Sequence, residues 1–303
     1  MFRLAHVSDP HLGPLPEVRL RELVGKRVLG YINWRLNRGR GGMRPVVLDQ
    51  IVADLRAHAP DHTVVTGDIV NIALDAELEP ARRWLASLGP GRDVSAVPGN
   101  HDAYVPGALH RAAEAWAPFV RGDGVQAGHW PFVRRRGPVA VIGLSSAEVT
   151  PPFMATGRFD AGQALRLAEM LDHAAHDGLY RVVLIHHPPA RRPDHWAGRL
   201  IGTSRMREVI RAHGAELILH GHTHRATVEW LEGRDRPVPL VGVPSASRNP
   251  GSERRGAGWN LFEIDGTPGA WRTTRIERGF RDAASGIVEI SRSRLLPDQD
   301  AAE

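Results

Sequence analysis

Short apolar runs alternate with helical patterns along most of the chain. The runs are rich in β-branched residues and bounded by turn-forming residues, as in buried strands; they lie at 3–8, 62–66, 94–98, 128–135, 139–144, 181–185 and 216–219. Apolar residues with a period of about 3.6 predict helices near 45–55, 75–88, 108–120, 164–175 and 204–213. Four later runs predict antiparallel strands at 227–231, 238–243, 259–264 and 271–276.

This order of elements predicts an α/β (α+β) fold. Strands alternate with helices early in the chain and the end is rich in strands, which favours two packed sheets with helices outside. Polar residues follow strands over the whole range from 9 to 224, so we expect one domain, over 1–279. The polar residues 280–303 are expected to form a loosely held tail.

Composition narrows the class of protein. The chain has no cysteine, which excludes disulfides and thiolate metal ligands. It has no apolar run long enough for a membrane span, and its N-terminus leads into a strand rather than a signal peptide. The expected location is therefore the cytoplasm, with peripheral contact at the inner membrane surface as a further option.

The positive charge is concentrated in one segment, residues 17–44. This segment holds eight basic and two acidic residues, whereas the whole chain has a net charge of +5. Apolar residues at 20, 24, 28 and 31/32 follow a helical period interrupted by Gly25 and Gly30, and the segment also contains Trp34. A basic amphipathic insert of this kind is typical of a membrane-surface contact. The alternatives are nucleic-acid contact, or a helical cover of the sheet edge with solvated arginines.

Polar side chains that could bind metal follow five of the predicted strands. They are Asp9 and His11, Asp68, Asn100 with His101 and Asp102, His186 and His187, and His222 and His224. Any one of these residues alone is typical of a turn or a helix cap. Together they form an N/O ligand set suited to Mn, Fe or Zn. The pairs Asp9/His11 and His222/His224 are spaced i, i+2, which in extended chain places both side chains on one side.

These motifs resemble the five signature blocks of the calcineurin-like metallophosphoesterases. In chain order the blocks are Ser8-Asp9-Pro10-His11, Gly67-Asp68, Gly99-Asn100-His101-Asp102, His186-His187-Pro188-Pro189 and Gly221-His222-Thr223-His224. The last two motifs are most similar to those of the bacterial cyclic-nucleotide and glycerophosphodiester phosphodiesterase branch of this family. The resemblance implies a four-layer αββα sandwich of two mixed β-sheets flanked by helices.

The resemblance also implies a role for each motif residue. Two divalent ions would share Asp68. The ligands of the first ion would be Asp9, His11, Asp68 and His224, and those of the second Asp68, Asn100, His186 and His222. His101 would face the substrate, oriented by a hydrogen bond to Asp102, while a hydroxide shared by the ions attacks phosphorus. His187 would line the site without binding metal, and Gly99 would allow a sharp turn at the end of its strand.

Several substrates are compatible with such a site. The first is a small phosphodiester, either a cyclic nucleotide or a glycerophosphodiester. The second is the pyrophosphate of a nucleotide-linked lipid such as UDP-2,3-diacylglucosamine, held partly by residues 17–44. A DNA nuclease is disfavoured, because the chain outside that insert is nearly neutral and duplex binding needs a broad basic face. A non-catalytic membrane-surface module that retains the motifs is the alternative from another functional class.

Overall fold

The computed structural model describes residues 1–38, 45–190, 193–250, 256–282 and 284–296. Arg40 and Arg44 of the basic insert lie outside the described residues. Among the described residues, no helix is both long and apolar enough to cross a membrane.

The first sheet has six strands, in the order β14-β13-β12-β1-β2-β3. Their bounds are β1 Phe2–Val7, β2 His62–Val65, β3 Val94–Ala96, β12 Gly258–Asp265, β13 Arg272–Phe280 and β14 Ile287–Arg294. Strands β1, β2 and β3 run parallel, whereas β1, β12, β13 and β14 pair antiparallel. The three parallel strands therefore end at one edge.

The second sheet also has six strands, in the order β10-β11-β9-β7-β5-β4. Their bounds are β4 Phe132–Arg136, β5 Val139–Gly143, β7 Tyr180–Leu184, β9 Leu217–His220, β10 Thr227–Leu231 and β11 Val238–Gly242. The four inner strands are parallel, and β4 and β10 add antiparallel edges. A small sheet pairs β6 Gly157–Arg158 with β8 Leu200–Ile201, two short strands that the sequence pattern did not predict.

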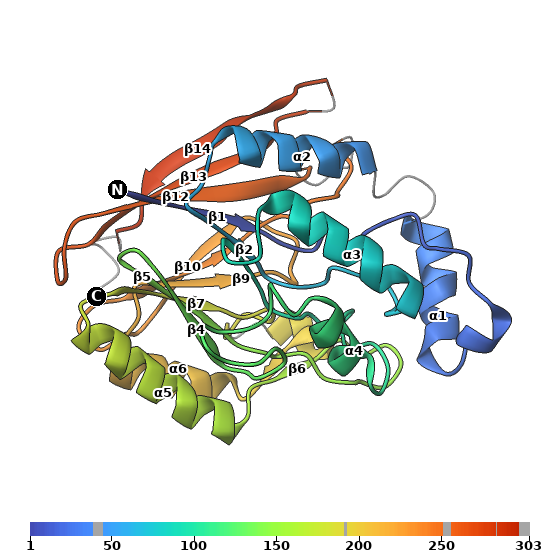
Figure 1. Cartoon of the computed structure of the whole chain (residues 1–303), viewed down its shortest axis with the longest axis horizontal. Coiled ribbons are helices and arrows are strands. Elements are labelled where there is room, and N and C mark those ends of the chain that lie inside the picture. The colour runs from blue at the N-terminus through green and yellow to red at the C-terminus, as the bar shows by residue number, and fades with distance from the viewer. Residues whose placement is uncertain (39–44, 191–192, 251–255, 283, 297–303) are drawn as a thin grey trace.

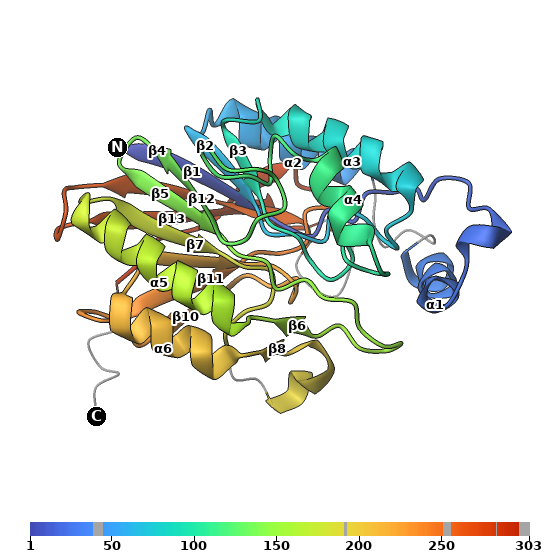
Figure 2. The ribbon, with the colours of Figure 1, turned by 60° about the horizontal axis from the view of Figure 1, so that its bottom comes forward.

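Helices cover both outer faces, so the predicted αββα sandwich is confirmed (Figures 1 and 2). Helices α2 Pro45–Ala57, α3 Asp75–Leu88 and α4 Ala108–Ala115 lie over the first sheet, and α5 Ala161–His176 and α6 Thr203–His213 over the second. The inner faces meet in an apolar layer that includes Leu4, Val64 and Phe262 from the first sheet and Val182 and Leu219 from the second.

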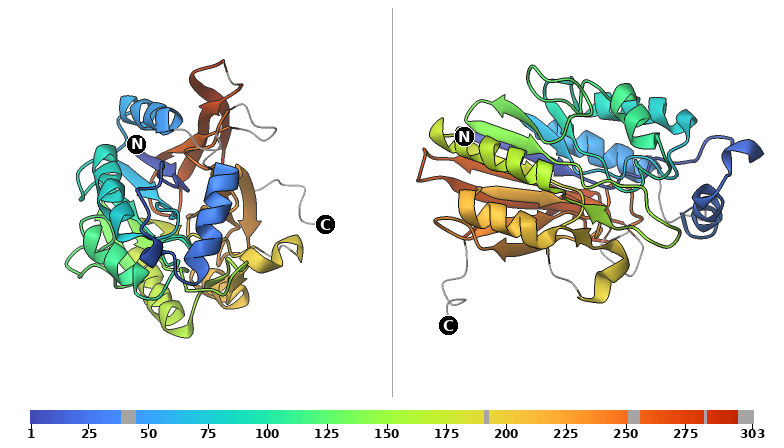
Figure 3. Two further views of the ribbon diagram at one scale, coloured as in Figure 1. Left: turned by 90° about the vertical axis from the view of Figure 1, so that its right-hand side faces the viewer. Right: turned by 90° about the horizontal axis from the view of Figure 1, so that it is seen from below.

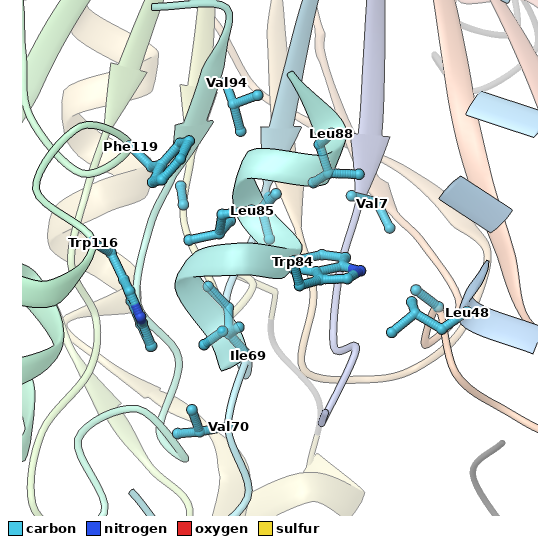
Figure 4. Packing of buried hydrophobic residues seen from close by; sticks show 14 of the residues in the cluster. Val7, Leu48, Ile69, Val70, Trp84, Leu85, Leu88, Val94, Trp116 and Phe119 are labelled. Atoms are coloured by element: carbon cyan, nitrogen blue, oxygen red, sulfur yellow. The ribbon is translucent and has the colours of Figure 1, made fainter. Parts of the chain in front are cut away.

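Helix α3 shows how this packing is encoded. Its buried positions Ala81, Trp84, Leu85 and Leu88 recur every three or four residues and face the strands of the first sheet (Figure 4). Each fully buried leucine of this kind contributes about 1.5–3 kcal/mol. At the start of the helix, the buried Glu77 carboxylate accepts the backbone N–H groups of residues 71, 72 and 74. The helix thereby holds a loop that reaches the candidate site.

The expectation of a loosely held tail is wrong for residues 287–294. They form β14, which pairs with β13 from Phe280↔Ile287 to Thr274↔Arg294. The strand lies at the edge of the sheet and its side chains are half-buried or exposed, so it lacks the alternation of apolar and polar residues that would reveal it. Its backbone supplies hydrogen-bond partners that β13 would otherwise lack. The boundary expected at 279 therefore cuts a β-hairpin.

The basic insert stands at the edge where β1 ends, beside the body of the molecule (Figures 1 and 3). It contains a short 3-10 helix, Leu20–Glu22, then α1 Lys26–Asn33, continued by a π-helical turn at Trp34–Arg38. Within the described part of the insert, large apolar side chains are exposed at Leu20, Val24, Val28, Leu29, Ile32 and Leu36.

Candidate metal centre

The loops that follow β1, β2, β3, β7 and β9 bring all the motif residues to one edge of the two sheets. Open α/β sheets place their ligands at the carboxyl ends of the strands for the same reason. Four of these residues, Asp9, His11, Asp68 and His224, have ligand atoms that lie within 4.8 Å of one another. They are the residues expected to hold the first ion.

Short distances connect this first group. His224 Nε2 lies 3.1 Å from Asp9 Oδ1 and 3.3 Å from His11 Nε2. His11 Nε2 lies 3.7 Å from Asp68 Oδ2. Imidazole nitrogens therefore converge on carboxylate oxygens, with Asp9, His11 and Asp68 fully or almost fully buried.

A second group adjoins the first across Asp68. His186 Nε2 is 3.5 Å from the same Asp68 Oδ2, and His222 Nδ1 is 3.1 Å from Asn100 Oδ1. The other carboxylate oxygen, Asp68 Oδ1, accepts the backbone N–H of His101 at 2.8 Å. One Asp68 oxygen thus lies between the two groups, where a ligand shared by two ions would be placed.

His187 also lies in the second group by distance, beside His186 and His222. Both of its ring nitrogens already have partners. Nε2 donates to the carbonyl of Ala155 at 2.9 Å, which leaves Nδ1 to accept from the Ser146 hydroxyl at 2.8 Å. No lone pair remains for a metal, which supports leaving His187 out of the ligand set.

The chemistry of the residues fits divalent cations. His186 Nδ1 lies 2.6 Å from the carbonyl of Thr66 and donates to it, so Nε2 is the ring nitrogen left to bind a metal. That Nε2 atom is buried and has no hydrogen-bond partner among the described residues. A buried polar atom of this kind is costly unless a ligand satisfies it. The set of imidazole, carboxylate and amide donors also suits Mn, Fe or Zn.

The two carboxylates create a strong demand for positive charge. Although burial opposes ionisation, the surrounding imidazoles, first of all His186, hold the pKa of Asp68 well below its usual range. Burial likewise opposes charge on His186, but the Asp68 carboxylate outweighs it and raises the pKa of His186 to about 9. Cations bound at this centre would meet the same demand.

The backbone around these ligands is not extended, which corrects the expected geometry of the i, i+2 pairs. Asp9, His11, His222 and His224 all have positive φ, between 40° and 64°. Left-handed residues turn the chain at the end of each strand. The two pairs reach one centre through these turns rather than through strand alternation.

Gly99 also has a different role from the one expected. Its φ is not in the left-handed region, so a sharp turn does not explain it. A Cβ atom at this position would lie 2.2 Å from Asp68 Oδ1 and 2.5 Å from Asp68 N. Glycine is needed because the chain passes directly over the residue that joins the two groups.

The prediction of a hydrogen bond between Asp102 and His101 is wrong. Both Asp102 oxygens accept backbone N–H groups, Oδ1 from residues 69 and 70 and Oδ2 from Gly99. His101 Nδ1 instead donates to the carbonyl of Asn71. Burial and the nearby Asp68 charge raise the pKa of Asp102 to about 7. Asp102 therefore ties two loops of the centre together, and Asn71 orients the imidazole.

Sequence reasoning missed two residues near His101, of which the first contacts it directly. The Tyr104 ring stacks on the imidazole with centroids 5.6 Å apart and planes at 18°. The Lys26 ammonium of α1 lies 4.6 Å from the centre of the same phenol ring. The backbone carbonyl of Asn71 carries no sequence signal. Lys26 does carry one, because it is the only lysine in the chain.

Comparison with known proteins gives distant relatives in sequence and in fold. A probable cyclic nucleotide phosphodiesterase of Synechococcus sp. is 26% identical over 235 residues, covering 74% of this chain and 79% of the relative. A dimetal phosphatase from Danio rerio has a TM-score of 0.58 at 14% identity, with 96% of this chain and 99% of the other covered. A purple acid phosphatase from yellow lupin has the same TM-score at 11% identity, with coverages of 97% and 53%. The two structural likenesses concern the fold.

The family model of the calcineurin-like phosphoesterases matches residues 2–226, which include every motif residue of the centre. The match spans well over half of the chain, and the sandwich and the two donor groups agree with it. The chain therefore belongs to the calcineurin-like phosphoesterase family, whose members are metal-dependent phosphoester hydrolases.

Proposed function

We propose that this protein hydrolyses a small phosphodiester of the cyclic-nucleotide or glycerophosphodiester type at a dinuclear metal centre. The observation that carries the proposal is the junction at Asp68, whose Oδ2 lies 3.7 Å from His11 Nε2 and 3.5 Å from His186 Nε2. The substrate class is supported by the Synechococcus relative, a probable cyclic nucleotide phosphodiesterase.

The residues proposed to hold the first ion are Asp9, His11, Asp68 and His224, and those for the second are Asp68, Asn100, His186 and His222. When bound, the two cations supply an activated water and positive charge against the phosphate oxygens. The chain's own contribution is to set these donors in place before the ions arrive. The hydrogen bonds of His186 to Thr66 and of His11 Nδ1 to Val70, the latter at 3.3 Å, fix which ring nitrogen faces the centre.

His101 is the residue proposed to act on the substrate. Its Nδ1 is held by the Asn71 carbonyl and its ring by Tyr104, so the Nε2 edge, 3.9 Å from Asp68 Oδ2, points into the centre. From there it can donate a proton to the leaving oxygen or a hydrogen bond to a phosphoryl oxygen. The backbone N–H of His101 on Asp68 Oδ1 couples its position to the centre.

The test is a comparison of substrates with the Mn²⁺-loaded protein. Bis(p-nitrophenyl) phosphate, cyclic AMP and glycerophosphocholine are assayed beside p-nitrophenyl phosphate, a monoester. We expect hydrolysis of at least one natural diester, and its loss in Asp68→Asn, which keeps the size of the side chain. Hydrolysis of the monoester alone would contradict the proposal, as would a protein that binds two ions and cleaves none of these diesters.

One observation favours a second candidate, hydrolysis of a nucleotide-linked lipid pyrophosphate. The insert beside the centre exposes apolar side chains at Val24, Ile32 and Leu36, with exposed fractions of 70%, 48% and 55%. Such a surface could receive acyl chains while the head group reaches the centre. Adding UDP-2,3-diacylglucosamine to the substrate panel tests it, and a kcat/KM below that of the small diesters would exclude it as the preferred substrate.

A further inference from the structure

The ammonium group of Lys26 is held beside the centre by the insert. Nζ donates to Thr150 Oγ1 at 2.6 Å and to the carbonyl of Met154 at 3.2 Å, and it lies over the Tyr104 ring. The same ring stacks on His101. Lys26 is therefore one aromatic side chain away from the residue proposed to act on the substrate.

This cation has no counter-ion within ion-pair distance in the described part of the chain. Its hydrogen-bond partners are a hydroxyl and a carbonyl, both neutral. Burial lowers the pKa of Lys26, and the Asp68 carboxylate acts in the opposite direction. A half-buried positive charge without a neutralising partner is a natural contact for an anion.

The position of Lys26 is fixed by the packing of α1. At Gly30, one turn further along the helix, a Cβ would lie 2.4 Å from the Tyr104 hydroxyl, so the helix backbone is pressed against that ring. On the neighbouring side, Arg27 donates to the carbonyls of Ile72 and Ala73. These contacts attach the helix to the loops of the centre and hold the ammonium before substrate binds.

We infer that Lys26, with Tyr104 and Thr150, forms an anion subsite that receives a second negatively charged group of the substrate, a phosphate or carboxylate beyond the scissile diester. The inference rests on the proposed phosphodiesterase activity and predicts a preference, within its substrate class, for diesters with an additional negative charge over those without one, such as cyclic AMP and glycerophosphocholine. The residue type at position 26 agrees with this inference, because Lys26 is the only lysine among the 39 lysine and arginine residues of the chain. Lysine presents a compact charge with rotatable donors.

The kinetic test uses two diesters that differ by one charge, p-nitrophenyl phenyl phosphate and p-nitrophenyl 4-carboxyphenyl phosphate. We expect the metal-loaded wild type to prefer the carboxylate, and Lys26→Met to reduce the ratio of the two kcat/KM values by about tenfold, the worth of one charge-assisted contact. Lys26→Arg should retain part of the preference. The matched control is Arg35→Met, which removes an exposed positive charge from the same insert. An equal ratio in wild type and Lys26→Met would overturn the subsite.

A binding measurement separates this inference from the proposed activity. Because the chain has a single lysine, protein labelled with ¹³C at lysine Cε and loaded with Zn²⁺ gives one side-chain signal. We expect the carboxylated diester to shift this signal and the diester without the carboxylate, which carries only its phosphate charge, to leave it in place. That result supports the subsite even if neither diester is cleaved, in which case only the proposed activity fails. A signal that neither diester moves, or that both move equally, overturns the subsite.

Discussion

At the scale of single residues, the centre stores backbone strain. Asp9, His11, Asp68, His222 and His224 are non-glycine residues with positive φ, a conformation that costs about 1–3 kcal/mol each. Hydrogen bonds compensate for part of it: the N–H of residue 9 donates to the carbonyl of residue 67, and the N–H of residue 11 to that of residue 68. These hydrogen bonds hold the strained turns, and with them the ligand side chains, in position.

Asp102 is expected to stabilise the fold rather than to orient the imidazole. Replacing it by alanine leaves three buried N–H groups, of residues 69, 70 and 99, without an acceptor. Asp102→Ala should therefore lower the free energy of unfolding by about 2–4 kcal/mol, measured by urea denaturation in EDTA. Asp102→Asn, which keeps one oxygen, should lose less. If Asp102→Ala had unchanged stability but reduced turnover, this prediction would be contradicted, and the earlier hypothesis that Asp102 orients His101 would explain the result better.

His101 is expected to be needed for turnover but not for metal binding. Removing a positioned proton donor lowers kcat by about 10²–10⁴, so His101→Ala should show a loss of this size with diester substrates. The metal content of the same preparation, measured by elemental mass spectrometry, should match that of the wild type. Loss of metal in this variant would make His101 a ligand and contradict its assigned role.

The buried His62 makes stability depend on pH. Burial, assisted by Arg136 and Arg134, lowers the pKa of His62 to about 3, and its Nε2 lies 2.8 Å from Ser95 Oγ. Below pH 6.5 the unfolded chain binds a proton there that the folded chain does not, so stability falls as pH falls. Between pH 8 and pH 5 the wild type should lose about 2 kcal/mol more than His62→Gln. Parallel stability curves for the two proteins would contradict this origin.

At the scale of elements, α1 is a cover held by one face. No residue of this helix is fully buried, and its closest backbone approach to the loops of the centre is at Gly30, beside the hydrogen bonds of Lys26 and Arg27. Gly30→Val should displace the helix from Tyr104 and reduce the preference for the carboxylated diester, while the free energy of unfolding changes by less than about 1 kcal/mol. Leu29→Val, on an exposed part of the same helix, is the control. A Gly30→Val protein with wild-type preference would show that α1 does not position Lys26.

Elements with strong periodicity were predicted well from the sequence, and weak edge elements were not. Helix α3 begins at Asp75 and ends at Leu88, as its apolar spacing predicts. In β6, β8 and β14 the pairing is visible only in three dimensions, since these strands are short or lie at an edge and bury little. The helical period predicted helix α1, but it did not predict that Gly30 packs against Tyr104.

At the scale of the whole molecule, two sheets bring together loops that are far apart in sequence. The motif residues from 9 to 224 could be assigned to one centre because each follows a strand and parallel strands end together. What could not be predicted are contacts made by the backbone, such as the carbonyl of Asn71 on His101 and the N–H groups on Asp102. Any residue type offers these groups, so no sequence pattern reveals them.

The central claim is that phosphodiester hydrolysis by this protein depends on two metal ions that share Asp68. The most direct measurement is a titration of the metal-free protein with Mn²⁺ while hydrolysis of bis(p-nitrophenyl) phosphate is followed. The account predicts that activity rises to a plateau at two equivalents of metal per chain. Full activity at one equivalent, or in the metal-free protein, would contradict it.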